Sequence, residues 1–430
     1  DGDLDLFVAN YGCQPCSLQN RPPYDLGHAK LFRNDGNGTF EDRTDLLEGI
    51  EGVQAMGFAG LWFDADGDGD PDLLILNDTR ANQQEEPRTT SSDGPSVTGA
   101  PGNALVRNDG PGCDGWCFSD GTIQAGLGQR GGYMGGAVAD FSGTGRPDVF
   151  MSNTGIVGGP AVLLENGGGR YEDVAPDRNA ALGEWSWGAT PIDANLDGLV
   201  DVFVPVGYAE ALNMLHLDQA RQLGTTGLGE KRAEILAGEA GVPEEAIRPP
   251  YPVADDPQPR TDNNRLLLQQ ADGSFEIHVI GDTDAHPPPH YTSAVADFDG
   301  DGWPDVVTGT LGQGYALLRN TGATGAGNHR IALRLAGDGD HVNRDAVGAR
   351  AQVRGSDGAV RTSWVQIGSG LGGGSDTELL IGMGTATAVE LTVTWPDGTT
   401  TTVSDLPTDQ RGVLRYGESA PTWEPFATPR

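Results

Sequence analysis

The sequence is poor in the residues that build a nucleic-acid surface, a membrane span or a long helix. Lys and Arg number 27 against 62 Asp and Glu among 430 residues, which gives a formal net charge of −35. Phosphate backbones and anionic membrane surfaces would repel such a chain, so we expect no nucleic-acid partner. No apolar run reaches the length of about 18 residues that a membrane-spanning helix needs, so membrane insertion is not expected. Aromatic residues make up only 7%, whereas 66 Gly and 28 Pro indicate many tight turns.

Catalytic motifs are also missing. The chain contains no nucleophile elbow, no His-Glu-x-x-His zinc motif and no phosphate-binding loop. His286 and His290 flank three prolines, which favours a Pro-rich loop over a metal-binding pair. Trp185 and Trp187 open a strand-like stretch, so packing is favoured over a platform for sugar stacking. We therefore predict that the protein is not an enzyme.

Cysteine is scarce, and its four copies form two close pairs, Cys13/Cys16 and Cys113/Cys117. Ser17 stands where a c-type haem attachment motif would have His, which excludes that motif. Two local disulfides in the surface loops of an exported protein are favoured. A single zinc site that uses all four thiolates is the alternative.

One acidic nine-residue pattern dominates the sequence. In Asp64–Asp72 (loop two), carboxylates stand at positions one, three, five, seven and nine, and Gly69 stands at position six. Such closely spaced negative charge repels itself unless a hard cation lies among the carboxylates. The spacing recurs, in part with weaker ligands, in loop one (Asp1–Asp5, positions five to nine), loop three (Asp140–Asp148), loop four (Asp193–Asp201) and loop five (Asp297–Asp305).

We expect Ca²⁺ in each loop, bound by side chains at positions one, three, five and nine and by the carbonyl of position seven. Mg²⁺ demands a tighter octahedral geometry and is less favoured. The ion would be structural and would couple folding to external calcium. The candidate metal-ligating residues are Asp1, Asp3, Asp5, Asp64, Asp66, Asp68, Asp70, Asp72, Asp140, Ser142, Thr144, Arg146, Asp148, Asp193, Asn195, Asp197, Leu199, Asp201, Asp297, Asp299, Asp301, Trp303 and Asp305.

Short strands flank these loops. An apolar or β-branched run follows each loop, and a run of small residues precedes each complete one, so each loop is a hairpin tip rather than an EF-hand. A second recurring sequence segment, typified by Leu31–Phe40 with its Asn-Asp-Gly turn, supplies two more strands to each repeat. Four strands per repeat predict an all-β fold built from β-propeller blades. Five blades are visible, the first without its opening strand, and we expect seven in the complete propeller.

The domain boundaries follow from these repeats. Residues 1–328 form the predicted propeller, with insertions at about 79–102 and 209–263. Residues 329–417 alternate between strands and turns and predict a small antiparallel β-domain, and 418–430 predict an extended tail. Because Asp1 falls in the middle of a ligand loop, we expect the chain to be part of a longer protein.

The chain resembles a known group of proteins. Its repeats are similar to FG-GAP/VCBS repeats, the blades of integrin-α-type propellers. The C-terminal region resembles the ASPIC/UnbV domain of cartilage-acidic-protein-like proteins, through Asn343–Arg350, Gly368–Leu371, Ile381–Gly384 and Trp395–Gly398. The resemblance implies an exported protein, at the cell surface or outside the cell. Loop three departs from the acidic pattern at its third and fifth positions and is the weakest candidate calcium site.

The leading hypothesis is a secreted, calcium-binding propeller that acts in adhesion, extracellular matrix or surface assembly. Its protein or glycan ligands would bind at a propeller face or at the insertions. One alternative is a lectin-like propeller that binds carbohydrate. Another is a self-assembling filament or sheath subunit, in which the truncated first blade pairs with a strand of a second chain. A calcium-dependent enzyme that acts on polysaccharides has the least support.

Overall fold

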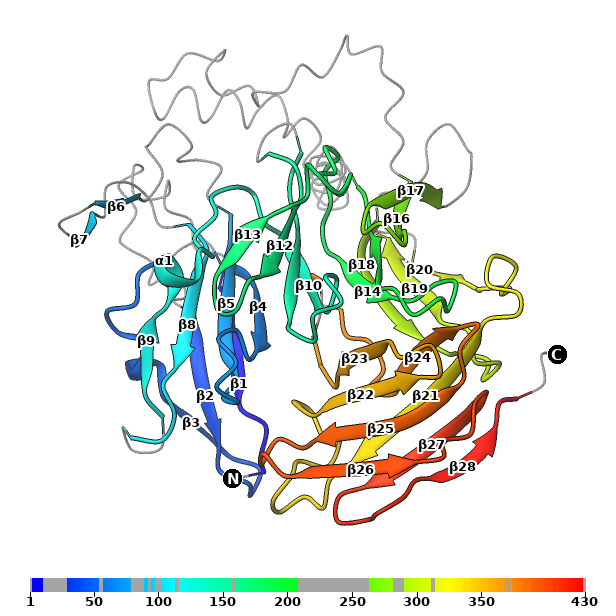
Figure 1. Cartoon of the computed structure of the whole chain (residues 1–430). Coiled ribbons are helices and arrows are strands. Elements are labelled where there is room, and N and C mark those ends of the chain that lie inside the picture. The colour runs from blue at the N-terminus through cyan, green and yellow to red at the C-terminus, as the bar shows by residue number, and fades with distance from the viewer. Residues whose placement is uncertain are drawn as a thin grey trace, which may run out of the picture.

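The structure is a computed structural model, and strands dominate the part of the chain that it describes (Figure 1). Helical turns occur at η2 (Thr44–Leu47) and α1 (Thr122–Ala125). No helix among the described residues has the length and apolar character needed to cross a membrane. The described ranges are 2–10, 29–53, 57–78, 89–91, 94–96, 102–112, 116–155, 159–207, 263–280, 290–310, 314–368, 370–371 and 373–427.

Five antiparallel sheets follow one another in chain order and confirm the predicted blades. Blades two, three and four have four described strands each, and blades one and five have three. Their strands are β1 (Leu6–Val8), β2 (Lys30–Asn34) and β3 (Phe40–Asp42); β4 (Gly57–Phe63), β5 (Asp72–Asn77), β8 (Ala104–Asn108) and β9 (Phe118–Asp120); β10 (Gly135–Ala139), β11 (Asp148–Ser152), β12 (Val162–Asn166) and β13 (Tyr171–Asp173); β14 (Thr190–Ile192), β15 (Asp201–Val204), β16 (Asn264–Gln269) and β17 (Phe275–Ile280); and β18 (His290–Ala296), β19 (Asp305–Thr310) and β20 (Gly314–Leu318).

The second strand of a blade packs against both neighbouring blades. In β5, Leu73 and Ile75 belong to the core shared with blade one, whereas Leu74 and Leu76 belong to the core shared with blade three. This explains the continuous apolar run after loop two, because a strand buried on both faces needs no polar alternation. The small-residue strands β4, β10, β14 and β18 lie side by side as the innermost strands of their blades. The insertion after β5 contributes a hairpin of β6 (Thr89–Ser91) and β7 (Gly94–Ser96).

The C-terminal region forms two facing sheets around one core (Figure 1). Its sheet orders are β24-β21-β27-β28 and β23-β22-β25-β26. All neighbouring strands are antiparallel except β21 and β27, which run parallel. The prediction of an antiparallel domain is therefore wrong for this one pair, and the sheet that contains it is mixed. The long connection between these two strands allows a parallel crossover. The strands are β21 (His329–Ala336), β22 (Arg350–Gly355), β23 (Val360–Trp364), β24 (Leu379–Gly384), β25 (Ala388–Thr394), β26 (Thr400–Ser404), β27 (Gln410–Arg415) and β28 (Thr422–Pro425).

The C-terminal domain docks on the inner strands of the propeller through its main chain. The amide of Gly370 donates to the carbonyl of Gly136 in β10 (3.0 Å), and Asp376 donates to Val295 in β18 (3.1 Å). The amide of Gly384 at the end of β24 donates to Leu196 in loop four (2.9 Å). These bonds place the segment between β23 and β24 against blades three and five, and the end of β24 against blade four.

A single methyl group should disturb this docking. A Cβ added at Gly188 would lie 2.9 Å from the Cα of Gly370. The Cα is a main-chain atom and cannot move aside as the end of a flexible side chain could. We expect Gly188→Ala to destabilise the docked state by about 1–3 kcal/mol, as overpacking does. Hydrogen exchange around Gly370 should then accelerate. In the control Gly183→Ala the new Cβ meets nothing within 4 Å, so equal acceleration in both variants would contradict this account.

Candidate metal centres

Each complete loop joins the first and second strands of its blade and is closed by its own first aspartate. The amide of the position-six glycine donates to the position-one carboxylate in all four complete loops, at 3.1, 2.9, 3.0 and 2.9 Å. These glycines have positive φ values of 97°, 77°, 88° and 83° in Gly69, Gly145, Gly198 and Gly302. A residue with a side chain rarely adopts such a φ, which explains glycine at this position.

The position-nine aspartate has a second role that the spacing of the loop does not reveal. In Asp72, one carboxylate oxygen accepts from the amide of Ala65 (2.8 Å) and the other accepts from Asn108 at the end of β8 (2.7 Å). Asp148, Asp201 and Asp305 repeat this double acceptance, each from an amide early in the loop and from one at the end of the blade's third strand. The side chain therefore ties the loop to the third strand.

Loops two and five bring ligand oxygens closest together. Carboxylate oxygens of Asp64, Asp66 and Asp72 lie within 4.8 Å of one another, and so do those of Asp297, Asp299 and Asp301. Hard oxygen donors in this number suit Ca²⁺.

One carboxylate oxygen in loop five, Oδ1 of Asp297, indicates whether these residues fit a cation. The side chain of Asp297 is only 2% exposed, and its Oδ2 accepts from Gly302 and Arg411. Its Oδ1 forms no hydrogen bond of good geometry, although the main chain of Gly300 interacts with the carboxylate. A buried carboxylate oxygen without a partner is costly, and a cation beside it would remove that cost. The residues of loop five therefore fit a bound cation, and Asp297, Asp299 and Asp301 would hold it.

The other loops keep the shape but use more of their oxygens internally. In loop three the hydroxyls of Ser142 and Thr144 hydrogen-bond to each other (2.9 Å), and Arg146 donates to the carbonyl of Asn166 (2.9 Å). In loop four the side-chain amide of Asn195 donates to the carboxylate of Asp197 (2.9 Å).

Positions five to nine of loop one are only partly within the described residues. Asp5 accepts from the amide of Asn34 (2.9 Å), as the position-nine residue of the other loops does in its blade. Asp3 lies beside Gly36 in the turn between β2 and β3. Asp1 lies outside the described residues.

Burial makes the bare carboxylates hard to ionise. It raises the pKa of Asp72 to about 7, that of Asp140 to about 6 and that of Asp193 to about 8, against partial lowering by main-chain hydrogen bonds. Neighbouring aspartates add to the rise in Asp193 and Asp72. A bound cation would favour the ionised forms and oppose these shifts.

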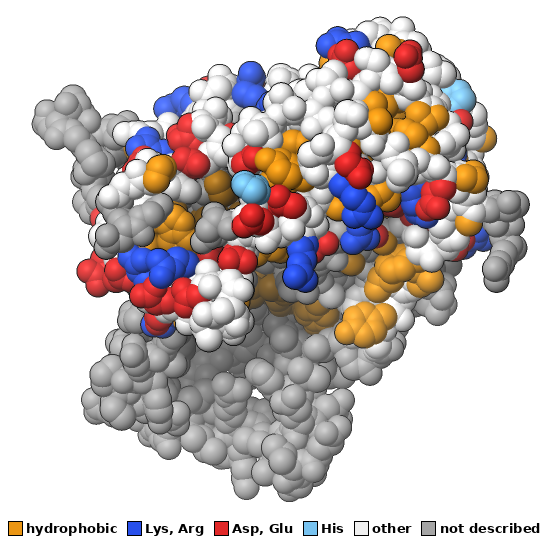
Figure 2. All heavy atoms as spheres, turned by 90° about the horizontal axis from the view of Figure 1, so that it is seen from below, with side chains coloured by type: hydrophobic (Ala, Val, Ile, Leu, Met, Phe, Trp, Pro, Cys, Tyr) orange, Lys and Arg blue, Asp and Glu red, His pale blue; other side chains and the backbone are white. Residues whose placement is uncertain are grey.

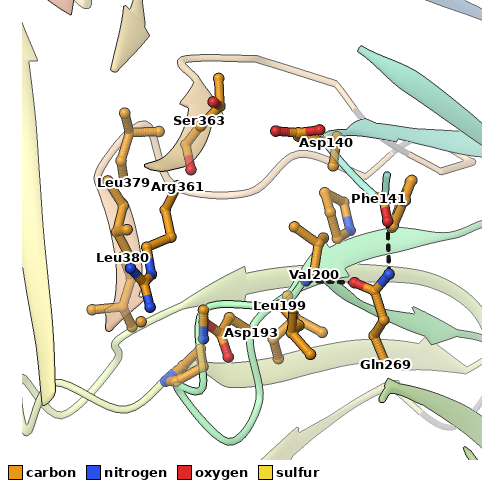
Figure 3. A pocket seen from close by; sticks show the side chains of 18 of the residues that line it. Asp140, Phe141, Asp193, Leu199, Val200, Gln269, Arg361, Ser363, Leu379 and Leu380 are labelled. Atoms are coloured by element: carbon orange, nitrogen blue, oxygen red, sulfur yellow. Dashed lines mark hydrogen bonds between the residues drawn. The ribbon is translucent and has the colours of Figure 1, made fainter. Parts of the chain in front are cut away.

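The first aspartates of loops three, four and five line one cleft of about 460 Å³ between the propeller and the C-terminal domain. Figure 3 shows Asp140 and Asp193 on the propeller side, and Arg361, Ser363 and Leu379 on the opposite side. Gln269 closes the propeller wall by donating to the carbonyl of Phe141 (2.7 Å) and accepting from Val200 (3.1 Å).

Several other sequence predictions can be placed in the structure. Trp185 and Trp187 are buried in a cluster with Met134, and Trp187 packs on Tyr291 with ring centroids 4.7 Å apart, which confirms their role in packing. His290 is buried and its Nδ1 lies 3.1 Å from the hydroxyl of Thr308.

The predicted disulfides remain a prediction. The described residues include Cys117 next to Gly112, but Cys13, Cys16 and Cys113 lie outside them, as does His286.

Comparison with known families agrees with the blades and the appended domain. An FG-GAP-like repeat model matches residues 1–75 and 140–204, and an FG-GAP repeat model matches 291–328. A model described as ASPIC and UnbV matches residues 339–421. The chain is an FG-GAP repeat protein with an ASPIC/UnbV domain. Loops two to five of this FG-GAP protein are the acidic tips of its repeats.

Individual relatives of the FG-GAP protein are remote. No curated protein sequence matches it. Among solved structures it is similar to the crystal structure of the V. cholerae biofilm matrix protein Bap1, with 12% sequence identity and a TM-score of 0.29. That match covers 94% of this chain and 60% of the Bap1 chain. The cartilage-acidic-protein-like subfamily stays a prediction.

Proposed function

We propose that the protein is a non-enzymatic, extracellular calcium-binding propeller that acts in adhesion or in an extracellular matrix. The FG-GAP repeats and the ASPIC/UnbV domain support this role at the level of protein class. Calcium would hold the hairpin tips of the blades and so make the folded form depend on the calcium that is abundant outside cells.

The unpaired, buried Oδ1 of Asp297 carries the calcium part of the proposal. It belongs to a group of three carboxylates whose oxygens lie within 4.8 Å, and a similar group occurs in loop two. In loop two, whose three carboxylates form no ion pair with an arginine among the described residues, a divalent cation is the simplest counter-charge. In loop five, arginines already supply part of that charge.

The surface seen from below does not by itself single out a partner. Acidic and basic side chains lie next to one another there with separate apolar patches between them (Figure 2). Such a mixture is ordinary for a folded protein, so the partner is a matter for experiment. Self-association into filaments would use such a surface as well and is the second form of the same proposal.

Carbohydrate binding through Trp185 and Trp187 has less support, because both side chains are buried and cannot stack on a sugar from solvent. The polysaccharide-acting enzyme has no specific observation in its favour, because the carboxylate clusters of loops two and five are explained by the metal loops.

A solid-phase binding assay tests the role. The purified full chain is expected to bind an extracellular-matrix protein or polysaccharide in calcium and to lose that binding in EGTA. The double variant Asp66→Asn with Asp68→Asn should bind less than the wild type at limiting calcium. Equal binding in calcium and EGTA would argue against a calcium-dependent matrix role.

Calcium affinity should depend on pH near neutrality. Because burial raises the pKa of Asp72 to about 7 and that of Asp193 to about 8, these carboxyls hold protons below those values and must release them to bind calcium. The apparent affinity should therefore rise by about tenfold or more between about pH 6 and about pH 8. Titration calorimetry in buffers of different ionisation enthalpy would detect the released protons. A pH-independent affinity without proton release would contradict this expectation.

A further inference from the structure

Loop five carries two arginine counter-charges on its ligand carboxylates. Arg319, directly after β20, donates from Nε to Oδ2 of Asp299 (2.6 Å) and from Nη2 to Oδ2 of Asp301 (3.2 Å). These two carboxylates are also members of the cation-sized cluster of the loop. Arg319 thus occupies oxygens that a cation would need.

The second arginine comes from the C-terminal domain. Arg411 in β27 donates from Nη2 to Oδ2 of Asp297 (2.9 Å), and its Nε lies 2.8 Å from Oε1 of Glu378. Asp297 is almost fully buried, so its contact with Arg411 is shielded from solvent. Arg330 of the same domain adds a hydrogen bond to the carbonyl of Asp301 (2.7 Å). Docking of the C-terminal domain therefore places two guanidinium groups on loop five, one of which is also paired with Glu378.

Loop two has a different arrangement. Its equivalent of Arg319 is Arg107 at the end of β8, which pairs with Asp109 outside the loop (Nε to Oδ1, 2.6 Å). In the described part of the chain, no ion pair joins an arginine to Asp64, Asp66 or Asp72. The two clusters have the same acidic pattern but different counter-charges.

We propose that loop five is a competitive site, at which calcium displaces Arg319 and opposes Arg411, so that calcium binding there and docking of the C-terminal domain weaken each other. The inference rests on the proposed calcium binding and deepens it. The unpaired Oδ1 of Asp297 keeps the loop able to take a cation, because Arg411 uses only Oδ2.

Electrostatics gives the sign of the coupling. A guanidinium and a divalent cation on the same carboxylate repel each other, and the repulsion is strong where the group is buried. Holding Asp297 in place before the ion arrives assists binding, but this ordering effect is small beside the repulsion of a +2 and a +1 charge. Coupling between two binding events is reciprocal, so if Arg411 lowers the affinity for calcium, calcium lowers the affinity for Arg411.

The test measures loop five by itself. Trp303 occupies position seven of loop five, so Tb³⁺ bound there is excited through it. Trp62 precedes loop two and can excite an ion there, so the part of the signal that Trp303→Phe removes is taken as that of loop five. Calcium affinity follows from displacement of Tb³⁺ in the full chain. Arg319→Gln should raise the calcium affinity of loop five about threefold and Arg411→Gln about tenfold, since the first pair is half exposed and the second is buried.

Matched variants separate charge from structure. Arg107→Gln removes the equivalent arginine of blade two and should leave the loop-five affinity unchanged. Arg411→Lys keeps the charge and should stay near the wild-type affinity. Hydrogen exchange in β27 should increase when calcium saturates the wild type, and in Arg411→Gln it should be high with or without calcium.

The possible outcomes distinguish the two proposals. If Arg319→Gln and Arg411→Gln leave the calcium affinity of loop five unchanged or lower it while the Tb³⁺ signal persists, the competition is overturned and calcium binding stands. If the wild type gives no Trp303-excited Tb³⁺ signal that calcium displaces, calcium binding at this loop is overturned as well. Arg319 lies on the surface, so its variant remains informative even if Arg411→Gln fails to fold.

Discussion

Removal of calcium with EGTA is expected to lower the melting temperature of the protein by roughly 10 °C. An ion at about 10–100 times its dissociation constant stabilises the folded state by about 1.4–2.7 kcal/mol, and loops two, four and five would each contribute. For a chain of this size, 1 kcal/mol corresponds to about 2 °C or slightly less. Differential scanning calorimetry in calcium and in EGTA measures the shift.

A control for this experiment removes one loop at a time. Asp66→Ala with Asp68→Ala deletes two side chains of the cluster region in loop two and should reduce the bound calcium by one ion. Both side chains are exposed, so the variant should lose little stability in EGTA. A melting temperature that is the same in calcium and in EGTA would show that the loops hold no ion that matters for stability.

The largest effect of a single substitution is expected at Asp148, and it should not need calcium. This carboxylate is fully buried and accepts from the amides of Ser142 (2.7 Å) and Asn166 (2.8 Å). Asp148→Ala would leave both donors without their acceptor at about 1–3 kcal/mol each. Burial raises the pKa of Asp148, which means that the folded state disfavours its negative charge. Replacement by Ala removes this unfavourable buried charge, and that gain offsets part of the cost. We expect a net loss of about 2–4 kcal/mol in the free energy of unfolding.

Urea denaturation in calcium and in EGTA tests the prediction for Asp148. The loss should be the same in both conditions, because loop three has the weakest ligands and its ninth residue acts through main-chain hydrogen bonds. Ser142→Ala, in the same loop, removes a hydroxyl but keeps the amide donor and should change stability by about 0.5 kcal/mol or less. If Asp148→Ala destabilises the protein only in calcium, its role is ligation rather than tying the loop to β12.

Much of the fold could be predicted from the chain because its signals are local and repeated. The apolar run after each loop and the Asn-Asp-Gly turns identified the four-stranded blade. The strands β27 and β28 were missed, since Gln410–Arg415 has little alternation and Thr422–Pro425 contains a proline. The parallel pairing of β21 with β27 depends on contacts between residues far apart in the sequence, which no local pattern encodes.

The site was predicted in composition but only partly in its connections. Spacing identified the aspartates and explained glycine at position six. The double hydrogen bonding of the ninth aspartate was not anticipated, although Asn34, Asn108, Asn166, Gln269 and Asn320 recur at the same point of the repeat and could have indicated it. The contact of Arg411 with Asp297 spans 114 positions and joins two domains, so only the tertiary structure reveals it.

The most direct test of the account is a crystal structure of the protein grown in calcium, with anomalous scattering used to locate the ions. We predict calcium peaks in loops two, four and five, with Oδ1 of Asp297 among the ligands of the last. Acidic loops without any peak at saturating calcium would contradict the central claim that these hairpin tips are calcium sites.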